Sequence, residues 1–171
     1  MRVLLTGFMG AGKTTVGRLL AEKLHLPFVD LDSEIEVRVG LSVRELFARH
    51  GEPEFRRVER EILTELLARD PLVLATGGGT LAEADNLALA KSAGLVIWLN
   101  PPFAVIARRI GPLGKRDRPL FPDEVAAFEL YRRRLPMYRR ADLQLDVAAE
   151  ESAPEVASRA ALRVSELLCN T

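Results

Sequence analysis

Residues 7–15 carry the residue types that polyphosphate chemistry requires, in the pattern G-x-x-x-x-G-K-T. Glycines let several backbone N–H groups point at one phosphate, because they adopt positive φ and carry no obstructing side chain. Lys13 would reach the β- and γ-phosphates, and the Thr14 hydroxyl would bind the magnesium that accompanies ATP. The pattern predicts that ATP is held by the following residues: Gly10, Ala11, Gly12, Lys13, Thr14 and Thr15.

The chain on either side of this segment helps to distinguish a phosphate-binding loop from an ordinary glycine-rich turn. Residues 3–5 are typical of a buried strand, and apolar residues between 16 and 24 recur at helical spacing. A loop between a strand and a helix N-terminus adds the helix dipole and unpaired N–H groups to the attraction for phosphate. This context favours the P-loop.

Two aspartates, Asp30 and Asp32, end a second apolar run, and we expect a strand that continues through residue 32. At the carboxyl edge of a parallel strand both carboxylates would lie where open α/β sheets bind ligands. The alternative is that one of them only caps a helix expected from Ser33, because aspartate is a good N-cap. Beside a P-loop, the pair favours a role in binding.

Three arginines, Arg56, Arg57 and Arg60, lie near the start of an expected helix. Cations in a first helical turn oppose the helix dipole, so a bound anion beside them would be stabilising. Taken alone, however, such residues are more often exposed or paired with neighbouring acids, here Glu59 and Glu61.

Two further segments have the composition of ligand-contacting loops. The glycines at 77–79 follow an apolar run, and their N–H groups have no side chains in the way; a plain flexible loop is the alternative. A basic segment with glycine and proline, at about 109–122, suits a mobile lid that folds over polyphosphate. An exposed basic loop is the alternative there.

Five apolar runs separated by helical patterns predict an α/β fold with a parallel sheet and right-handed crossovers. The expected strands are residues 3–5, 27–32, 72–76, 95–99 and 143–147. The expected helices include a short one from 42 to near 51, another from 52, and three at 103–110, 123–140 and 154–168. In the helix 123–140 we expect these residues to face inward: Val125, Phe128, Tyr131, Leu135 and Tyr138.

The 171 residues are enough for one domain with a substantial core, and we expect a single domain over 1–171. Lys plus Arg and Asp plus Glu both number 24, so the overall charge favours neither nucleic acid nor membrane as a partner. The single cysteine, Cys169, excludes an internal disulfide. The early first strand leaves no room for a leader, and no apolar run approaches about 18 residues, so we expect a cytoplasmic protein.

Several short motifs follow the P-loop in a fixed order. They are Asp30-Leu31-Asp32, Glu54-Phe55-Arg56, Gly77-Gly78-Gly79, Arg118-Pro119-Leu120 and Arg134-Leu135-Pro136-Met137-Tyr138. Together they resemble shikimate kinase across nearly the whole chain. The resemblance implies a three-layer fold like that of nucleoside-monophosphate kinases, with five parallel strands in the order 2-3-1-4-5 and a mobile lid. It also implies transfer of the γ-phosphoryl group of ATP to the 3-hydroxyl of shikimate, within aromatic amino acid biosynthesis.

The same resemblance assigns roles to individual residues. The catalytic residues would be Lys13, Asp32 and Arg118, with Arg118 reaching over the phosphates from the lid. Magnesium would be held by Thr14 and, through water, by Asp30. Shikimate would be bound by a helical segment at about 32–61 and by other elements, through Asp32, Arg56, Gly78, Gly79 and Arg134. Arg109 would stack on adenine, and other adenine contacts, after the last strand, would be through backbone. We also expect a monomer.

Three other functions are consistent with parts of the sequence. A gluconate or nucleotide kinase of the same fold would use Asp32 and one arginine, although the triple glycine and the placement of Arg56 and Arg134 favour a cyclic acid. A non-catalytic ATP-dependent switch would not need these acids and arginines. An RNA-binding protein would need exposed aromatic residues among its arginines and a basic overall charge.

Overall fold

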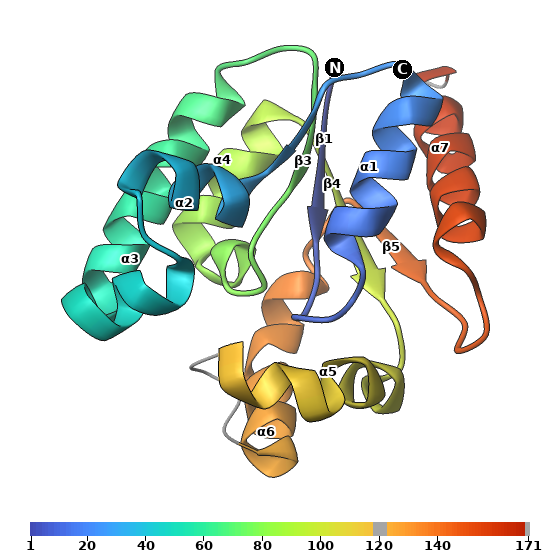
Figure 1. Ribbon diagram of the computed structural model, residues 1–171. Coiled ribbons are helices and arrows are strands. Elements are labelled where there is room, and N and C mark those ends of the chain that lie inside the picture. Colours follow the sequence, from blue (N-terminus) through green and yellow to red (C-terminus); the bar gives the residue numbers. More distant parts are fainter. Residues whose placement is uncertain (118–122, 170–171) are drawn as a thin grey trace.

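The computed structural model describes residues 1–117 and 123–169, which form a parallel sheet covered by helices (Figure 1). The strands are β1 (Arg2–Thr6), β2 (Phe28–Asp30), β3 (Leu72–Ala75), β4 (Leu95–Asn100) and β5 (Leu143–Asp146). All neighbouring strands pair in parallel, in the order β2-β3-β1-β4-β5. The expected strand order is confirmed.

Two groups of helices cover the two faces of the sheet, and a third lies at its carboxyl end (Figure 1). One face is covered by α1 (Lys13–Leu24) and α7 (Ala153–Cys169). The other is covered by α2 (Leu31–Val39), α3 (Val43–Leu67) and α4 (Ala84–Ala93). Helices α5 (Phe103–Asp117) and α6 (Glu124–Tyr138) lie at the carboxyl end of the strands, and the short 3-10 helix η1 (Thr80–Ala82) precedes α4.

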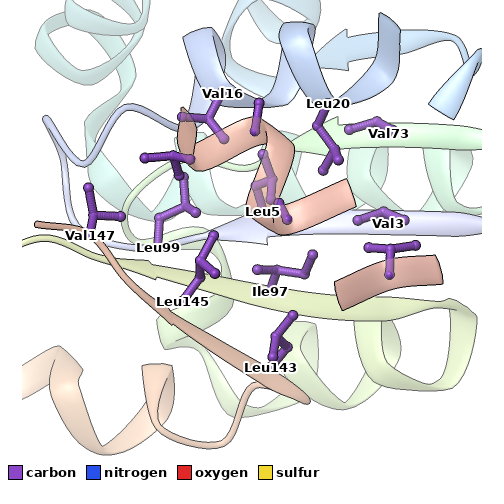
Figure 2. Packing of buried hydrophobic residues seen from close by; sticks show 14 of the residues in the cluster. Val3, Leu5, Val16, Leu20, Val73, Ile97, Leu99, Leu143, Leu145 and Val147 are labelled. Atoms are coloured by element: carbon purple, nitrogen blue, oxygen red, sulfur yellow. The ribbon is translucent and has the colours of Figure 1, made fainter. Parts of the chain in front are cut away.

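The core explains why the strands are continuously apolar. In β1, Val3 and Leu5 pack toward α1 and α7, whereas Leu4 packs toward α3 and α4, and all three are fully buried. Figure 2 shows the first of these faces, where side chains of β1, β4 and β5 meet α1. A parallel sheet buried on both faces needs such strands, and each buried Val or Leu stabilises the fold by about 1.5–3 kcal/mol.

Three element boundaries differ from expectation. Strand β2 ends at Asp30 and α2 begins at Leu31, so Asp32 lies in the first turn of a helix rather than on the strand. The two helices expected on either side of residue 51 form one element, α3, with a kink at Gly51 (φ 79°, ψ 171°). Helix α5 continues to Asp117 instead of ending at 110, because glycine and proline weaken a helix without forbidding it.

The inward face of α6 was also predicted wrongly in part. Val125 is 70% exposed and Phe128 43% exposed, whereas Ala127, Arg134 and Tyr138 are buried. The helix therefore turns a more polar face toward the sheet than its apolar pattern indicates. Among the described residues no helix is long and apolar enough to cross a membrane.

Candidate active site

The P-loop between β1 and α1 has the backbone that its glycines permit. Gly7, Gly10 and Gly12 all have positive φ. A Cβ atom at Gly7 would lie 2.6 Å from the carbonyl oxygen of Leu99, so a larger residue does not fit. Helix α1 begins at Lys13 without a side-chain cap, which leaves its first N–H groups for a phosphate. Lys13 is buried, and its Nζ donates hydrogen bonds to the carbonyl oxygens of Gly7 (2.9 Å) and Phe8 (3.0 Å).

Thr14 and Asp30 meet at the rim of this loop. The Thr14 hydroxyl donates a hydrogen bond of 2.6 Å to Asp30 Oδ2, while Asp30 Oδ1 accepts one from the backbone N–H of Ser33. Asp30 therefore caps α2, as the alternative interpretation expected, and it also faces the P-loop, where its role in binding stays a prediction. Hydroxyl and carboxylate oxygens are ligands that suit Mg²⁺.

The protein alone offers few metal ligands there. Within residues 1–117 and 123–169 no three His, Cys, Asp or Glu side chains cluster as a metal site. This donor set fits an ion that takes most of its ligands from ATP phosphates and water.

A cavity of about 500 Å³ opens beside the P-loop, at the carboxyl ends of β2 and β3. This volume suits a small metabolite together with part of a nucleotide. Its polar lining includes the sequence-predicted residues Lys13, Thr14, Asp30, Asp32, Arg56, Gly78, Gly79 and Arg134. Residues separated by more than a hundred positions in the sequence are thus brought together.

Asp32 is the carboxylate most strongly affected by this environment. Burial raises its pKa from the ordinary 3.8 to about 6; the charge of Lys13 opposes the rise, and Asp30, Glu59 and Glu36 add to it. Gly77 leaves room for the group, because a Cβ there would lie 2.8 Å from Asp32 Oδ1. Asp32 is therefore mostly ionised at neutral pH and a better proton acceptor than an ordinary aspartate.

Arg56 and Arg134 converge on Gly79 from two different helices. A Cβ atom at Gly79 would lie 2.6 Å from Arg56 Nη2 and 2.8 Å from Arg134 Nη2. Arg134 is 9% exposed, and its guanidinium lies 5.9 Å from the ring centroid of Phe8. Two like charges that approach so closely in a cavity favour an anion between them.

The neighbours of Arg56 are acids on its own helix. Arg56 Nη1 donates a hydrogen bond of 2.7 Å to Glu59 Oε2, and Nη2 donates one of 3.2 Å to Glu52 Oε1. The expectation that these arginines pair with acids is thus correct, yet Arg56 also lines the cavity. Arg57 and Arg60 instead form exposed ion pairs outside it.

Glu59 was not identified as a site residue from the sequence. It is 1% exposed, and its second oxygen, Oε1, accepts a hydrogen bond of 2.6 Å from the Thr80 hydroxyl. The contacts with Thr80 and Arg56 fix the Glu59 carboxylate, and the carboxylate in turn orients the guanidinium of Arg56. A signal was present, because Glu59 occupies the buried face of α3 between Phe55 and Ile62, where an acid requires a partner.

The cavity also has an apolar wall that sequence reasoning did not assign. This wall is formed by Val43, Phe47 and Phe55, and the ring centroids of the two phenylalanines lie 4.5 Å apart. Such a surface suits the carbon face of a ring. Only the tertiary arrangement of α3 shows this wall, since these residues otherwise resemble ordinary core positions.

The structure describes only one of the two arginines that were expected to act from a lid. Arg109 lies against the P-loop, with Nη1 3.3 Å from the Gly10 carbonyl oxygen and 3.4 Å from that of Ala11. It is thus close to where a nucleotide would bind. Arg118 lies outside the described residues.

A central β1 strand leading into a P-loop, with a cavity lined by two arginines beside it, defines the class of P-loop kinases that act on small molecules. A family model described as shikimate kinase matches residues 9–165. The chain therefore belongs to the shikimate kinase family.

Individual relatives agree over most of the chain. A shikimate kinase from Synechococcus elongatus is 42% identical over 163 residues, which cover 94% of this chain and 84% of the relative. The structure of shikimate kinase from Acinetobacter baumannii in complex with shikimate has a TM-score of 0.87 at 36% identity, covering 99% of this chain and 93% of that one. Shikimate kinase from Aquifex aeolicus has a TM-score of 0.84 at 34% identity, with both chains fully covered.

Proposed function

We infer that the chain is an ATP-dependent phosphotransferase that converts shikimate and ATP to shikimate 3-phosphate and ADP, on the route to chorismate and the aromatic amino acids. Family membership supports this activity. The observation that carries the assignment to the cavity is the convergence of Arg56 and Arg134 in the same space as Asp32, beside Lys13.

The cavity matches the chemistry of shikimate, a small anion with three hydroxyls. Its carboxylate would bind between the guanidiniums of Arg56 and Arg134, and the N–H groups of Gly78 and Gly79 would add backbone contacts. Its hydroxyls need an acceptor, which Asp32 supplies. The wall of Phe47 and Phe55 would cover the ring.

In the transfer, a shikimate hydroxyl oxygen forms a bond to the γ-phosphorus while the bond to the β,γ-bridging oxygen breaks, and ADP leaves with that electron pair. The hydroxyl proton goes to the Asp32 carboxylate or to solvent. Because a loose transition state needs little base help, we assign Asp32 orientation first and proton acceptance second. Lys13 and Arg118 would stabilise charge on the transferring group.

We propose that Thr14 binds Mg²⁺ and that Asp30 supports it through water. When bound with ATP, the ion neutralises charge on the β- and γ-phosphates. The 2.6 Å hydrogen bond between Thr14 and Asp30 supports the proposal, because it keeps the hydroxyl ligand and the carboxylate that would hold the water on the same side of the P-loop.

We further propose that residues 1–171 act as one kinase domain, with a lid at about 109–122 and a substrate-binding segment at about 32–61. Lid closure would exclude water and so prevent hydrolysis of ATP. Arg109 would stack on adenine from α5. The protein would be a cytoplasmic monomer that binds neither nucleic acid nor membrane. Light scattering during gel filtration measures the molar mass in solution and so tests the monomeric state.

The test of function is ADP release from MgATP by purified protein, with shikimate, gluconate or nucleoside monophosphates as acceptor. We expect release that depends on shikimate and is negligible with the others. Turnover with gluconate instead would assign the cavity to an open-chain acid. ATP binding without turnover on any acceptor would point to a nucleotide-dependent switch.

Replacing Arg134 with alanine should raise the KM for shikimate about tenfold or more and change the KM for ATP by less than about threefold. The reason is that a lost charge-assisted hydrogen bond costs about 1.5–3 kcal/mol. Arg133→Ala is the matched control, because Arg133 is the exposed neighbour on the same helix. Steady-state kinetics with each substrate varied in turn measures both effects; equal increases in the two KM values would contradict a carboxylate contact.

A further inference from the structure

The loop at 77–79 is held in place from α6 by one side chain. The Tyr138 hydroxyl donates a hydrogen bond to the carbonyl oxygen of Gly78. Tyr138 is 1% exposed, and its ring stacks on Trp98 with centroids 5.9 Å apart and planes at 29°. The ring is thus fixed by packing, and its hydroxyl holds a loop that is 60 residues away in the sequence.

Arg134 lies against the same loop, since a Cβ at Gly78 would lie 3.6 Å from its Nη1. Burial raises the pKa of Tyr138 to about 12, and the charge of Arg134 is the first of the influences that oppose the rise. The phenol therefore keeps its proton and can donate it to the Gly78 carbonyl oxygen. Arg134 and Tyr138 lie one helical turn apart on α6, which keeps the two groups in register.

The loop has little freedom to move without disturbing its neighbours. A Cβ at Gly78 would lie 3.0 Å from the backbone nitrogen of Met9 in the P-loop. On the other side, a Cβ at Gly79 would lie within 3 Å of nitrogen atoms of both Arg56 and Arg134. A displaced loop would therefore change the spacing of the two guanidiniums that face the cavity.

We propose that Tyr138 is a positioning residue for the acceptor site, because its hydroxyl holds the Gly78 carbonyl and so sets the spacing between the loop at 77–79 and the carboxylate-binding arginines that lie against it. Tyr138 is absent from the cavity lining, and it acts through the Gly78 carbonyl that its hydroxyl contacts. The proposal rests on the proposed function, in which this cavity binds shikimate.

Tyr138→Phe tests the proposal, because it removes only the hydroxyl and keeps the ring on Trp98. We expect the KM for shikimate to rise about tenfold, because the Gly78 carbonyl loses its hydrogen-bond donor and the loop at 77–79 loses its anchor, while the KM for ATP changes by less than about twofold. Shikimate affinity measured by calorimetry without nucleotide should fall by a similar factor. Tyr131→Phe is the matched control on the same helix; its hydroxyl contacts Asn100 Oδ1 at 3.5 Å, and both KM values should stay unchanged.

A purely structural role would give a different result. Loss of folded protein lowers kcat and leaves both KM values unchanged, and thermal unfolding of the variant measures that loss directly. An unchanged shikimate KM in Tyr138→Phe, or equal increases in both KM values, would overturn the proposal. Failure of the proposed function would appear earlier and separately, as wild-type protein that shows no ADP release with shikimate.

Discussion

Replacing Lys13 with methionine is expected to lower kcat by about 10³-fold or more while the protein remains folded. Lys13 is the buried cation of the P-loop, and preorganised charge on a transferring phosphoryl group accounts for a large share of catalysis. Methionine matches the length of the lysine stem, so the loss of two hydrogen bonds to loop carbonyls should be the main structural cost. ADP release at saturating shikimate measures the effect.

A matched control lies on the same helix. Lys23, in the last turn of α1, is exposed, so Lys23→Met makes the same chemical change away from the cavity and should leave kcat within about twofold. A second readout is the pKa of Asp32, because the charge of Lys13 partly offsets the rise in this pKa that burial causes. In Lys13→Met that pKa should rise above about 6, which NMR titration can follow. Near-normal turnover in Lys13→Met would refute the P-loop assignment.

The sheet and the P-loop could be predicted from the sequence because their signals are local. Fully apolar strands predict burial on both faces, and the glycine spacing of the P-loop requires the positive φ angles that the structure shows. The end of β2 was less predictable. Leu31 continues the apolar run, but it is buried as the first residue of α2 rather than as part of the strand.

The rest of the site depends on contacts between distant segments. Arg134 is one of several arginines in its helix, and only the position of α6 against the P-loop makes it the buried one. Its role came from family resemblance and not from local pattern. Tyr138 was expected to face inward, which is confirmed, but the partner of its hydroxyl could not be inferred from helical spacing.

Replacing Asp32 with asparagine should lower activity and raise stability at the same time. Asparagine can still contact a hydroxyl but cannot accept its proton or hold the negative charge that orients it, so we expect kcat/KM for shikimate to fall about 10²-fold or more. For the wild type, kcat/KM should decline below about pH 6, where Asp32 becomes protonated. The pH profile of the variant should lack this decline, and steady-state rates between pH 5 and 8 provide the measurement.

The stability effect follows from the direction of the pKa shift. Because the folded pKa of Asp32, about 6, exceeds the ordinary 3.8, the native state binds more protons between these values, and stability falls as pH rises through that window. Asp32→Asn removes this cost, so its free energy of unfolding should exceed the wild-type value by about 1–3 kcal/mol above pH 6 and by little at pH 4. Asp85→Asn, at an exposed carboxylate, should show no such pH-dependent gain. Site residues selected for reactivity carry a stability cost that an inert group does not. If Asp32→Asn were instead less stable than the wild type at pH 7, the Asp32 carboxylate would be stabilised by its protein neighbours. It would then not be available to accept a hydrogen bond from a substrate hydroxyl.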